Sequence, residues 1–203
     1  MPVDFANSET LKNLMRAFAG ESQARNRYTF AAAQCRRQGL HVLEAVFRFT
    51  ANQEKEHAEI FYQHMRPFAG GTVRIDGGYP VDLAEDAATL LRSARHGEYQ
   101  EHQEIYPAFA ETARQEGFDA VAASFRLIAA IEKTHGDRFG ALADLLEQGR
   151  LFAAGPQQGW LCLNCGHIHQ GPAAPGACPV CGHDQGFFLR TESAPFGLPG
   201  GVL

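Results

Sequence analysis

A set of glutamates and histidines recurs at regular spacing in the first three quarters of this sequence. A Glu-x-x-His pair occurs twice, and a single glutamate precedes each pair. The six residues are Glu21, Glu54, His57, Glu98, Glu132 and His135. Because residues three positions apart lie on one face of an α-helix, each pair can bind one ion or share two. One glutamate from each of two helices and a Glu-x-x-His pair from each of two others form the ligand set of a dinuclear carboxylate site, and such ligands with open positions suit iron or manganese.

Each of these residues has an ordinary explanation when it is taken alone. A helical glutamate is usually a solvated surface residue, and Glu-x-x-His occurs often by chance. The joint pattern is more specific, because several carboxylates buried without cations would be prohibitively costly. Either these side chains face water or they hold metal.

Three further residues near the glutamates extend the predicted site. Glu101 lies three residues after Glu98, and we predict it as an additional ligand on one side of the metal pair; a surface salt bridge is the alternative. Tyr28 and Tyr106 each lie about two turns after a glutamate and could hydrogen-bond a ligand carboxylate. Ordinary packed tyrosines would explain them equally well.

A second group of residues that could bind metal lies near the C-terminus. Two Cys-x-x-Cys pairs occur there, made of Cys162, Cys165, Cys178 and Cys181. Glycine follows each pair, which allows the tight turn in which backbone amides point at thiolate sulfur. Four thiolates in this arrangement predict a tetrahedral site for zinc or a single iron, and the spacing alone fits a structural zinc ribbon as well as a redox iron centre.

Four long helices are predicted to carry the carboxylates and imidazoles. Apolar residues recur there at helical spacing, and the expected helices cover about 8–37, 41–65, 82–115 and 119–148. Asn7 or Ser8, Asp82 and Asp119 are the expected helix-capping residues. Short links make the first and last pairs antiparallel hairpins, whereas the link at about 66–81 is long enough to cross the bundle. The expected fold class is therefore mainly α, a ferritin-like four-helix bundle with a long crossover between its second and third helices, followed by a small rubredoxin-like four-cysteine metal domain.

The two predicted hairpins are similar to each other in sequence. Glu21 matches Glu98 at an offset of 77 residues, whereas Tyr28 matches Tyr106 at an offset of 78. The third helix therefore carries one extra residue, and a single insertion inside a helix is usually absorbed as a π-bulge. We predict a π-helical irregularity within residues 98–107.

Composition and charge define the domains and exclude some functions. Glycine and proline become frequent near residue 149, so we predict a helical domain over 1–148, a linker over 149–159 and the cysteine domain over 160–203. A net charge of -5 gives no electrostatic reason to expect nucleic acid or an anionic membrane as partner. No apolar run approaches the length of a membrane span, and no secretory signal is visible, so the clustered cysteines indicate metal binding before disulfides.

On these residues the chain resembles the rubrerythrins nearly from end to end. The resemblance rests on the segments Ala19–Tyr28, Gln53–His57, Gly97–Glu101, Tyr106–Pro107, Glu132–His135 and Cys-Pro-x-Cys-Gly at 178–182. It implies a non-haem di-iron peroxidase that reduces hydrogen peroxide. It also implies that the iron ligands are Glu21, Glu54, Glu98, Glu101, Glu132 and His135. His57 would be a ligand in the reduced state, and Glu101 would replace it on one iron after oxidation.

The same resemblance implies how electrons reach the site. The four-cysteine site would hold iron and pass electrons onward, with a rubredoxin or an NAD(P)H-dependent reductase as donor, in a cytoplasmic protein that is commonly a dimer. The fourth helix continues roughly 18 Å beyond His135, so the tail begins past the end of the bundle. We therefore predict a head-to-tail homodimer in which the tail of one chain serves the di-iron site of the other.

Three alternatives remain open at this point. The same bundle could oxidise ferrous iron as an iron-handling ferroxidase, or it could reduce dioxygen as an oxidase. The tail could be a purely structural zinc ribbon. The metals actually loaded do not follow from the sequence.

Overall fold

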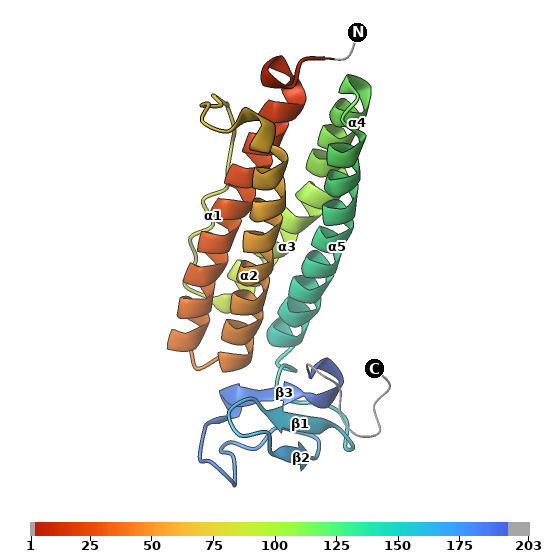
Figure 1. Cartoon of the computed structure of the whole chain (residues 1–203). Coiled ribbons are helices and arrows are strands. Elements are labelled where there is room, and N and C mark those ends of the chain that lie inside the picture. Colours follow the sequence, from red (N-terminus) through yellow and green to blue (C-terminus); the bar gives the residue numbers. More distant parts are fainter. Residues whose placement is uncertain (1–2, 195–203) are drawn as a thin grey trace.

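The computed structural model describes residues 3–194, and its order of elements is the predicted one (Figure 1). The helices are α1 (Glu9–Arg37), α2 (His41–His64), α3 (Ala87–Gln100), α4 (Tyr106–Glu116) and α5 (Asp119–Glu147). The strands are β1 (Gly159–Cys162), β2 (Ile168–Gln170) and β3 (Phe188–Arg190), which form an antiparallel sheet in the order β2-β1-β3. The predicted residues 195–203 of the cysteine domain lie outside the described residues, as do residues 1–2. None of the helices in the described part is long and apolar enough to cross a membrane.

The predicted third helix is one rod with a π-helical turn in its middle. The turn covers Glu101–Ile105 and joins α3 directly to α4. The π-helical turn thus accommodates the one extra residue of the second repeat, as predicted. Pro107 lies at the start of α4, just after the turn. The rod supplies the fourth wall of the bundle beside α1, α2 and α5 (Figure 1).

Short links close the two hairpins, and both place a glycine in the left-handed region. Gly39, between α1 and α2, has φ 69°, and Gly117, between α4 and α5, has φ 88°. Glycine is the residue that adopts this conformation without steric cost. Both hairpins therefore turn where the sequence predicted.

The predicted cap of the third helix is wrong by four residues, and that of the fourth helix by one. Asp86 caps α3 by accepting a hydrogen bond from the amide of Thr89 (2.8 Å), whereas Asp82 forms an ion pair with Arg27 of α1. This ion pair holds the end of the crossover extended along α1, so the helix begins after it. Asp119 is the first residue of α5 and not its cap.

Ser8, one of the two residues proposed to cap α1, does so by accepting from the amide of Leu11 at 3.0 Å. Glu116, at the end of α4, also caps the N-terminus of α1. Its carboxylate accepts from the amides of Glu9 and Thr10 and from the Thr10 hydroxyl. An anion at a helix N-terminus also interacts favourably with the helix dipole.

Replacing Glu116 by glutamine should lower the free energy of unfolding by about 1–2 kcal/mol at neutral pH. Burial alone would raise the pKa of Glu116, but its hydrogen bonds with Thr10 and Glu9 bring the pKa below the usual 4.5. A carboxyl whose pKa is lowered by folding stabilises the protein above about pH 4.5 and loses that contribution as the pH falls through the lowered value. Urea unfolding at several pH values should show the difference from the wild type shrinking in acid; a constant difference would contradict this account.

Two apolar clusters fill the bundle above and below its middle. In one, the rings of Tyr28, Phe47 and Phe139 pack with centroids 5.0–5.9 Å apart. In the other, Tyr106, Phe125 and Phe61 pack in the same way at 4.9–5.8 Å. These two trios are equivalent residues of the internal repeat, and the layer between them contains the polar residues described below.

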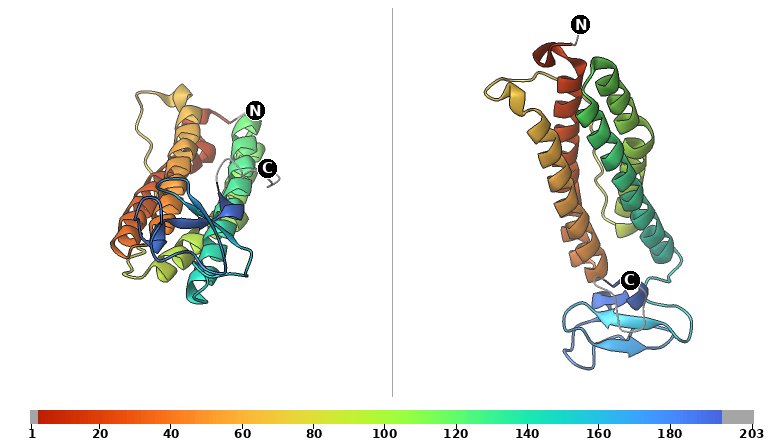
Figure 2. Two further views of the ribbon diagram at one scale, coloured as in Figure 1. Left: turned by 90° about the horizontal axis from the view of Figure 1, so that it is seen from below. Right: turned by 45° about the vertical axis from the view of Figure 1, so that its right-hand side comes forward.

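The cysteine domain packs against the end of the bundle at the turn between α1 and α2 (Figure 2). The ring of Phe187 stacks on His41 with centroids 3.9 Å apart. A Cβ on Gly186 would lie 1.7 Å from the carbonyl oxygen of Gly39, so only glycine permits this approach. On the other side, Arg190 donates to the carbonyl oxygen of Arg150 at 2.8 Å.

Candidate metal centre

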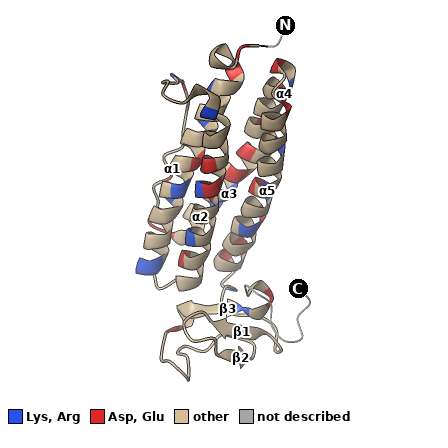
Figure 3. Ribbon diagram, in the orientation of Figure 1, with Lys and Arg blue, Asp and Glu red and all other residues tan. Residues whose placement is uncertain are grey.

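The six predicted glutamates and histidines meet in the middle of the bundle, where acidic residues gather on neighbouring helices (Figure 3). They form two groups, in each of which the candidate ligand atoms lie within 4.8 Å of one another. One group is Glu21, Glu54, His57 and Glu132; the other is Glu54, Glu98, Glu132 and His135. Glu54 and Glu132 belong to both, so the arrangement is that of two adjacent ion sites with two shared carboxylates. All six side chains are buried, none being more than 4% exposed.

Both imidazoles present Nδ1 to the shared carboxylates. His57 Nδ1 lies 3.0 Å from Glu132 Oε1 and 3.1 Å from Glu54 Oε2. His135 Nδ1 lies 2.9 Å from the other Glu132 oxygen and 3.1 Å from the other Glu54 oxygen. Each shared carboxylate thus directs one oxygen to each site.

Each group also contains one glutamate that is not shared. Glu21 Oε2 lies 3.8 Å from Nδ1 of His57, and Glu98 Oε2 lies 3.6 Å from Nδ1 of His135. The two halves of the centre are therefore built alike, as the internal repeat requires.

The centre contains buried polar atoms that have no hydrogen-bond partner in the structure. They are Glu21 Oε2, Glu54 Oε1, Glu98 Oε2, both carboxylate oxygens of Glu132, and His135 Nδ1. Buried polar atoms are almost always satisfied, and unpaired ones cost free energy. All of these atoms belong to the two groups of candidate ligands, so bound cations would satisfy them.

The raised pKa values of the buried carboxylates also indicate a site that binds cations. Burial, reinforced by the charge of Glu132, raises the pKa of Glu21 well above its ordinary value. Burial and the charge of Glu54 do the same to the pKa of Glu98. Two divalent ions would supply the positive charge that lets these carboxylates ionise. The residues present therefore fit a pair of metal ions.

Tyr28 and Tyr106 hydrogen-bond ligand carboxylates, and each donates to the glutamate of the hairpin to which it does not itself belong. The hydroxyl of Tyr28 on α1 donates to Glu98 Oε1 on α3 at 2.6 Å. The hydroxyl of Tyr106 on α4 donates to Glu21 Oε1 on α1 at 2.5 Å. Each tyrosine thereby leaves the second oxygen of its carboxylate for the metal, and the two bonds tie the hairpins together.

Replacing Tyr28 or Tyr106 by phenylalanine should weaken iron binding by about 10–100-fold, because the carboxylate loses the donor that orients it. The two variants should be affected similarly, since the two bonds are equivalent in the repeat. Titration of the metal-free protein with ferrous iron measures this, with Tyr62→Phe, an exposed tyrosine on α2, as control. Unchanged affinity in both variants would assign the two tyrosines to packing alone.

Glu101 has a different position from the other predicted ligands. It belongs to neither group of converging atoms and lines a pocket of about 270 Å³ between α1, the π-helical turn and the crossover. Burial and the neighbouring charge of Glu21 raise its pKa well above the ordinary value. Its predicted role as an additional ligand remains a prediction.

Gln53 is a residue of the centre to which the sequence analysis assigned no role. Its side-chain oxygen lies 3.1 Å from Nε2 of His135, on the side of the ring away from the carboxylates. A contact at Nε2 orients the ring and reserves Nδ1 for a metal. Its counterpart in the repeat, 78 residues later, is Ile131, so the repeat gave no signal for it.

The four cysteines of the tail converge as predicted. All four sulfur atoms lie within 4.8 Å of one another, with Cys162 and Cys181 3.8 Å apart and Cys165 and Cys178 3.6 Å apart. No disulfide joins them in the described residues.

The two cysteine turns have the same geometry. Gly166 and Gly182 have φ values of 78° and 75°, and their amides donate to the carbonyl oxygens of Cys162 and Cys178 at 2.9 Å. The amide of His183 hydrogen-bonds the thiol of Cys181 and lowers its pKa to about 6, whereas in the other turn the amide of His167 lowers the pKa of Cys165 but the neighbouring thiols raise it to about 12. Such turns favour thiolates and therefore a tetrahedral metal site.

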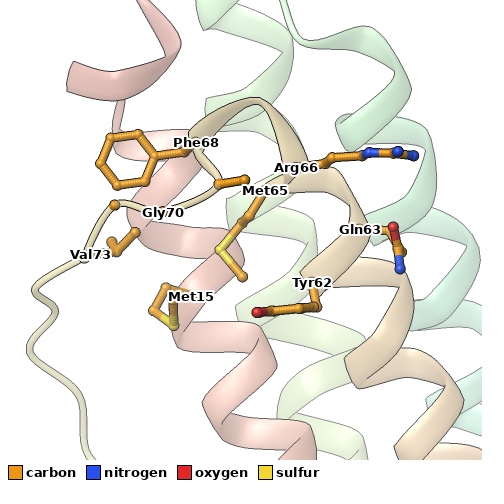
Figure 4. Close-up of a pocket in the computed structure, with 10 residues that line it drawn as sticks. Met15, Tyr62, Gln63, Met65, Arg66, Phe68, Gly70 and Val73 are labelled. Carbon is orange, nitrogen blue, oxygen red and sulfur yellow. The ribbon is translucent and has the colours of Figure 1, made fainter.

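A separate pocket of about 210 Å³ lies where the end of α2 and the start of the crossover meet α1 (Figure 4). Met15, Met65, Phe68 and Val73 surround it with mainly apolar side chains. Among the described residues that line it, none carries a carboxylate or an imidazole. It is therefore distinct from the metal centre.

A four-helix bundle with paired Glu-x-x-His motifs in its core defines a ferritin-like dinuclear metal protein. The sequence model described as rubrerythrin matches residues 12–143, and the one described as rubrerythrin, rubredoxin-like domain matches residues 160–188. The chain belongs to the rubrerythrin family.

Curated relatives and solved structures agree with this assignment. The chain is 44% identical to a rubrerythrin of Porphyromonas gingivalis over 89% of both chains. It is 43% identical to a rubrerythrin of Clostridium perfringens over 89% of this chain and 93% of that protein. The solved structure of fully reduced, all-ferrous nigerythrin superposes with a TM-score of 0.62 at 29% identity, covering 91% of this chain and 90% of that one.

The cofactors follow from the family and from the two clusters. They are two iron ions in the bundle and one iron in the four-cysteine site, where zinc is also possible. Members of this family are generally oxidoreductases.

Proposed function

We propose that this protein is a non-haem di-iron peroxidase that reduces hydrogen peroxide to water and receives electrons through its four-cysteine iron. The observation that carries the proposal is the presence, in one chain, of a buried two-ion carboxylate centre and a four-thiolate site suited to electron transfer. A storage or iron-handling role would have no use for the second site. A cytoplasmic location is part of the proposal and rests on the resemblance to the family.

Each side chain of the centre has a defined task in this proposal. Glu54 and Glu132, which belong to both groups of ligand atoms, would be shared by the two ions; Glu21 and His57 would hold one ion, and Glu98 and His135 the other. When bound, two ferrous ions supply the two electrons that split one peroxide into two waters, a reaction that also consumes two protons. Glu101, at the boundary between pocket and centre, can hold and return a proton where peroxide arrives, and can move toward the ions after oxidation.

The four-cysteine site restores the electrons one at a time, so two transfers complete a cycle. Within one chain, the helix between His41, where the tail packs, and Glu54 spans roughly 20 Å. We propose that transfer instead crosses to the centre of a partner chain in a head-to-tail homodimer. A rubredoxin or an NAD(P)H-dependent reductase would supply the electrons.

Stopped-flow oxidation of the fully reduced protein tests the proposed activity. Hydrogen peroxide should oxidise the di-iron centre much faster than dioxygen at equal concentration, and two ferrous ions should be consumed per peroxide. Faster reaction with dioxygen would instead support an oxidase or a ferroxidase. Metal analysis and the visible spectrum of the tail distinguish iron from a structural zinc.

Mixing two inactive variants tests transfer between chains. A chain with a defective bundle centre and a chain with a defective cysteine site should form mixed dimers in which one complete path remains. Recovery of a substantial fraction of the donor-dependent turnover supports the proposal. No recovery, although mixed dimers form, places the path within one chain.

A further inference from the structure

The pocket beside Glu101 reaches the edge of the metal centre. Its inner wall includes Glu101 and Tyr106, and the hydroxyl of Tyr106 donates to the ligand candidate Glu21. The side chain of Glu101 makes no hydrogen bond or ion pair with any residue in the described part of the chain. A small molecule in this pocket would therefore approach the centre from the side of Glu101 and Glu21.

The outer wall of the pocket is a segment of the crossover, residues 76–82, which we call the strap. It is fixed to α1 at both ends. Asp76 pairs with Arg16 at 2.7 Å, and the backbone oxygen of Asp76 accepts from Nε of the same arginine at 3.1 Å. Asp82 pairs with Arg27, about three turns further along α1. The strap thus spans the part of α1 that carries Gly20 and Glu21.

Tyr79 lies at the middle of the strap and faces α1. Its hydroxyl donates to the backbone oxygen of Arg16 at 3.0 Å, and its side chain lines the pocket. The residue is 40% exposed, so one side of it meets solvent and the other side meets the pocket. The ring therefore stands between solvent and Glu101.

The passage between Tyr79 and Glu101 runs over Gly20. A Cβ at Gly20 would lie 3.8 Å from Cε1 of Tyr79 and 3.8 Å from Oε1 of Glu101, with no other heavy atom within 4 Å apart from its own surroundings in the helix. One methyl group placed there would touch both side chains at ordinary van der Waals distance. A methyl group at Gly20 would therefore occupy the space between these two side chains, which we call the neck.

We propose that Gly20 and Tyr79 form a size-selective neck that admits hydrogen peroxide to the metal centre and excludes branched organic hydroperoxides. This inference rests on the proposed peroxidase function and specifies its substrate class. Hydrogen peroxide is a chain of two oxygen atoms and can pass end-on through a space that a single methyl group would occupy. A tertiary hydroperoxide carries three methyl groups on one carbon and cannot.

The internal repeat supplies a matched control for the neck. Gly97 of α3 is the counterpart of Gly20 and also lines the pocket, but a Cβ there would meet only the guanidinium of Arg27 at 3.8 Å. Alanine in place of either glycine should stabilise its helix slightly, because glycine is the weaker helix former. The two substitutions are thus alike except for the neck.

The first experiment compares Gly20→Ala with Gly97→Ala. Both variants should unfold at a slightly higher temperature than the wild type. Only Gly20→Ala should lower the second-order rate constant for oxidation of the reduced protein by hydrogen peroxide, by about tenfold. Equal rate constants in the two variants would contradict the proposal that Gly20 forms a size-selective neck.

The second experiment widens the neck by removing the ring of Tyr79, which belongs to the strap. Tyr79→Ala should raise the rate constant for tert-butyl hydroperoxide relative to that for hydrogen peroxide by about tenfold. Leu83→Ala alters an exposed residue of the crossover and should keep the wild-type ratio. A similar change in Leu83→Ala, or no change in Tyr79→Ala, would count against the proposal.

A third measurement does not depend on peroxidase activity. Azide, a linear anion, should bind the oxidised iron-loaded protein and produce a new visible absorption band. Its rate of appearance should fall about tenfold in Gly20→Ala, remain unchanged in Gly97→Ala and rise in Tyr79→Ala. If the wild type fails to reduce peroxide, the proposed function fails, and the azide rates alone then decide whether the neck exists.

Discussion

Replacing Glu132 by glutamine should abolish the dinuclear centre but leave the metal-free protein about as stable as the wild type. Glu132 is fully buried, and both of its oxygens take part in the two groups of candidate ligands. Glutamine has one oxygen and no charge, so it cannot bridge two cations. Iron bound in the bundle should fall from two ions to one or none, and peroxide reduction should fall on the order of a thousandfold.

Thermal unfolding with and without metal checks this prediction. In the metal-free protein, the substitution removes both the repulsion between Glu132 and Glu21 and the ion pairs of Glu132 with His57 and His135, so the variant should unfold at a temperature close to that of the wild type. Ferrous iron at about a hundred times its Kd should stabilise the wild type by about 2.7 kcal/mol and the variant by much less. Glu59→Gln, a change at an exposed glutamate of α2, should follow the wild type throughout. A metal-free variant less stable than the wild type would mean that Glu132 has a structural role independent of metal.

Replacing Cys178 by serine should unfold the cysteine domain and leave the bundle intact. Within the described residues, the buried core of this domain consists of Trp160, Cys162, Ala174, Cys178 and Phe188. So small a core cannot fold without its metal, whose binding contributes about 10 kcal/mol or more in comparable small domains. Turnover with an external electron donor should fall by more than about a hundredfold, whereas the reduced bundle should still react once with peroxide.

The chain contains its own reporter for this unfolding. Trp160 is its single tryptophan and is completely buried in the cysteine domain, where its Nε1 donates to the carbonyl oxygen of Gly171 at 2.9 Å. With zinc in the tail, tryptophan emission should shift to longer wavelength in Cys178→Ser, while the helical circular dichroism signal remains. Cys35→Ala, at the buried cysteine of α1 outside both clusters, should keep the wild-type emission. An unshifted spectrum in Cys178→Ser would show that the domain folds without a complete thiolate set.

The sequence predicted the bundle and the ligand candidates because both are encoded in local spacing. Helical periodicity marks which residues share a face, and the repeat offset indicated the π-helical turn. The start of α3 was misplaced because the interaction that sets it, between Asp82 and Arg27, joins segments 55 residues apart. Gln53 and the crossed tyrosine bonds were missed for a similar reason: a helix pattern shows which way a side chain faces, not which partner on another helix it meets.

The strap was beyond prediction on physical grounds. Its residues follow no periodicity, and they are positioned by ion pairs with α1 and by the hydrogen bond of Tyr79. The sequence predicted only a link long enough to cross the bundle. Its course along α1, over Gly20, required the three-dimensional structure.

The π-helical turn has a consequence for how the two ions share charge. A doubled hairpin alone would give both ions the same surroundings and hence the same affinity for an electron. The added residue places Glu101 beside one half only, since its counterpart in the first hairpin is Ala24. Two iron ions held there would therefore differ in reduction potential, the ferric state being favoured in the half beside Glu101.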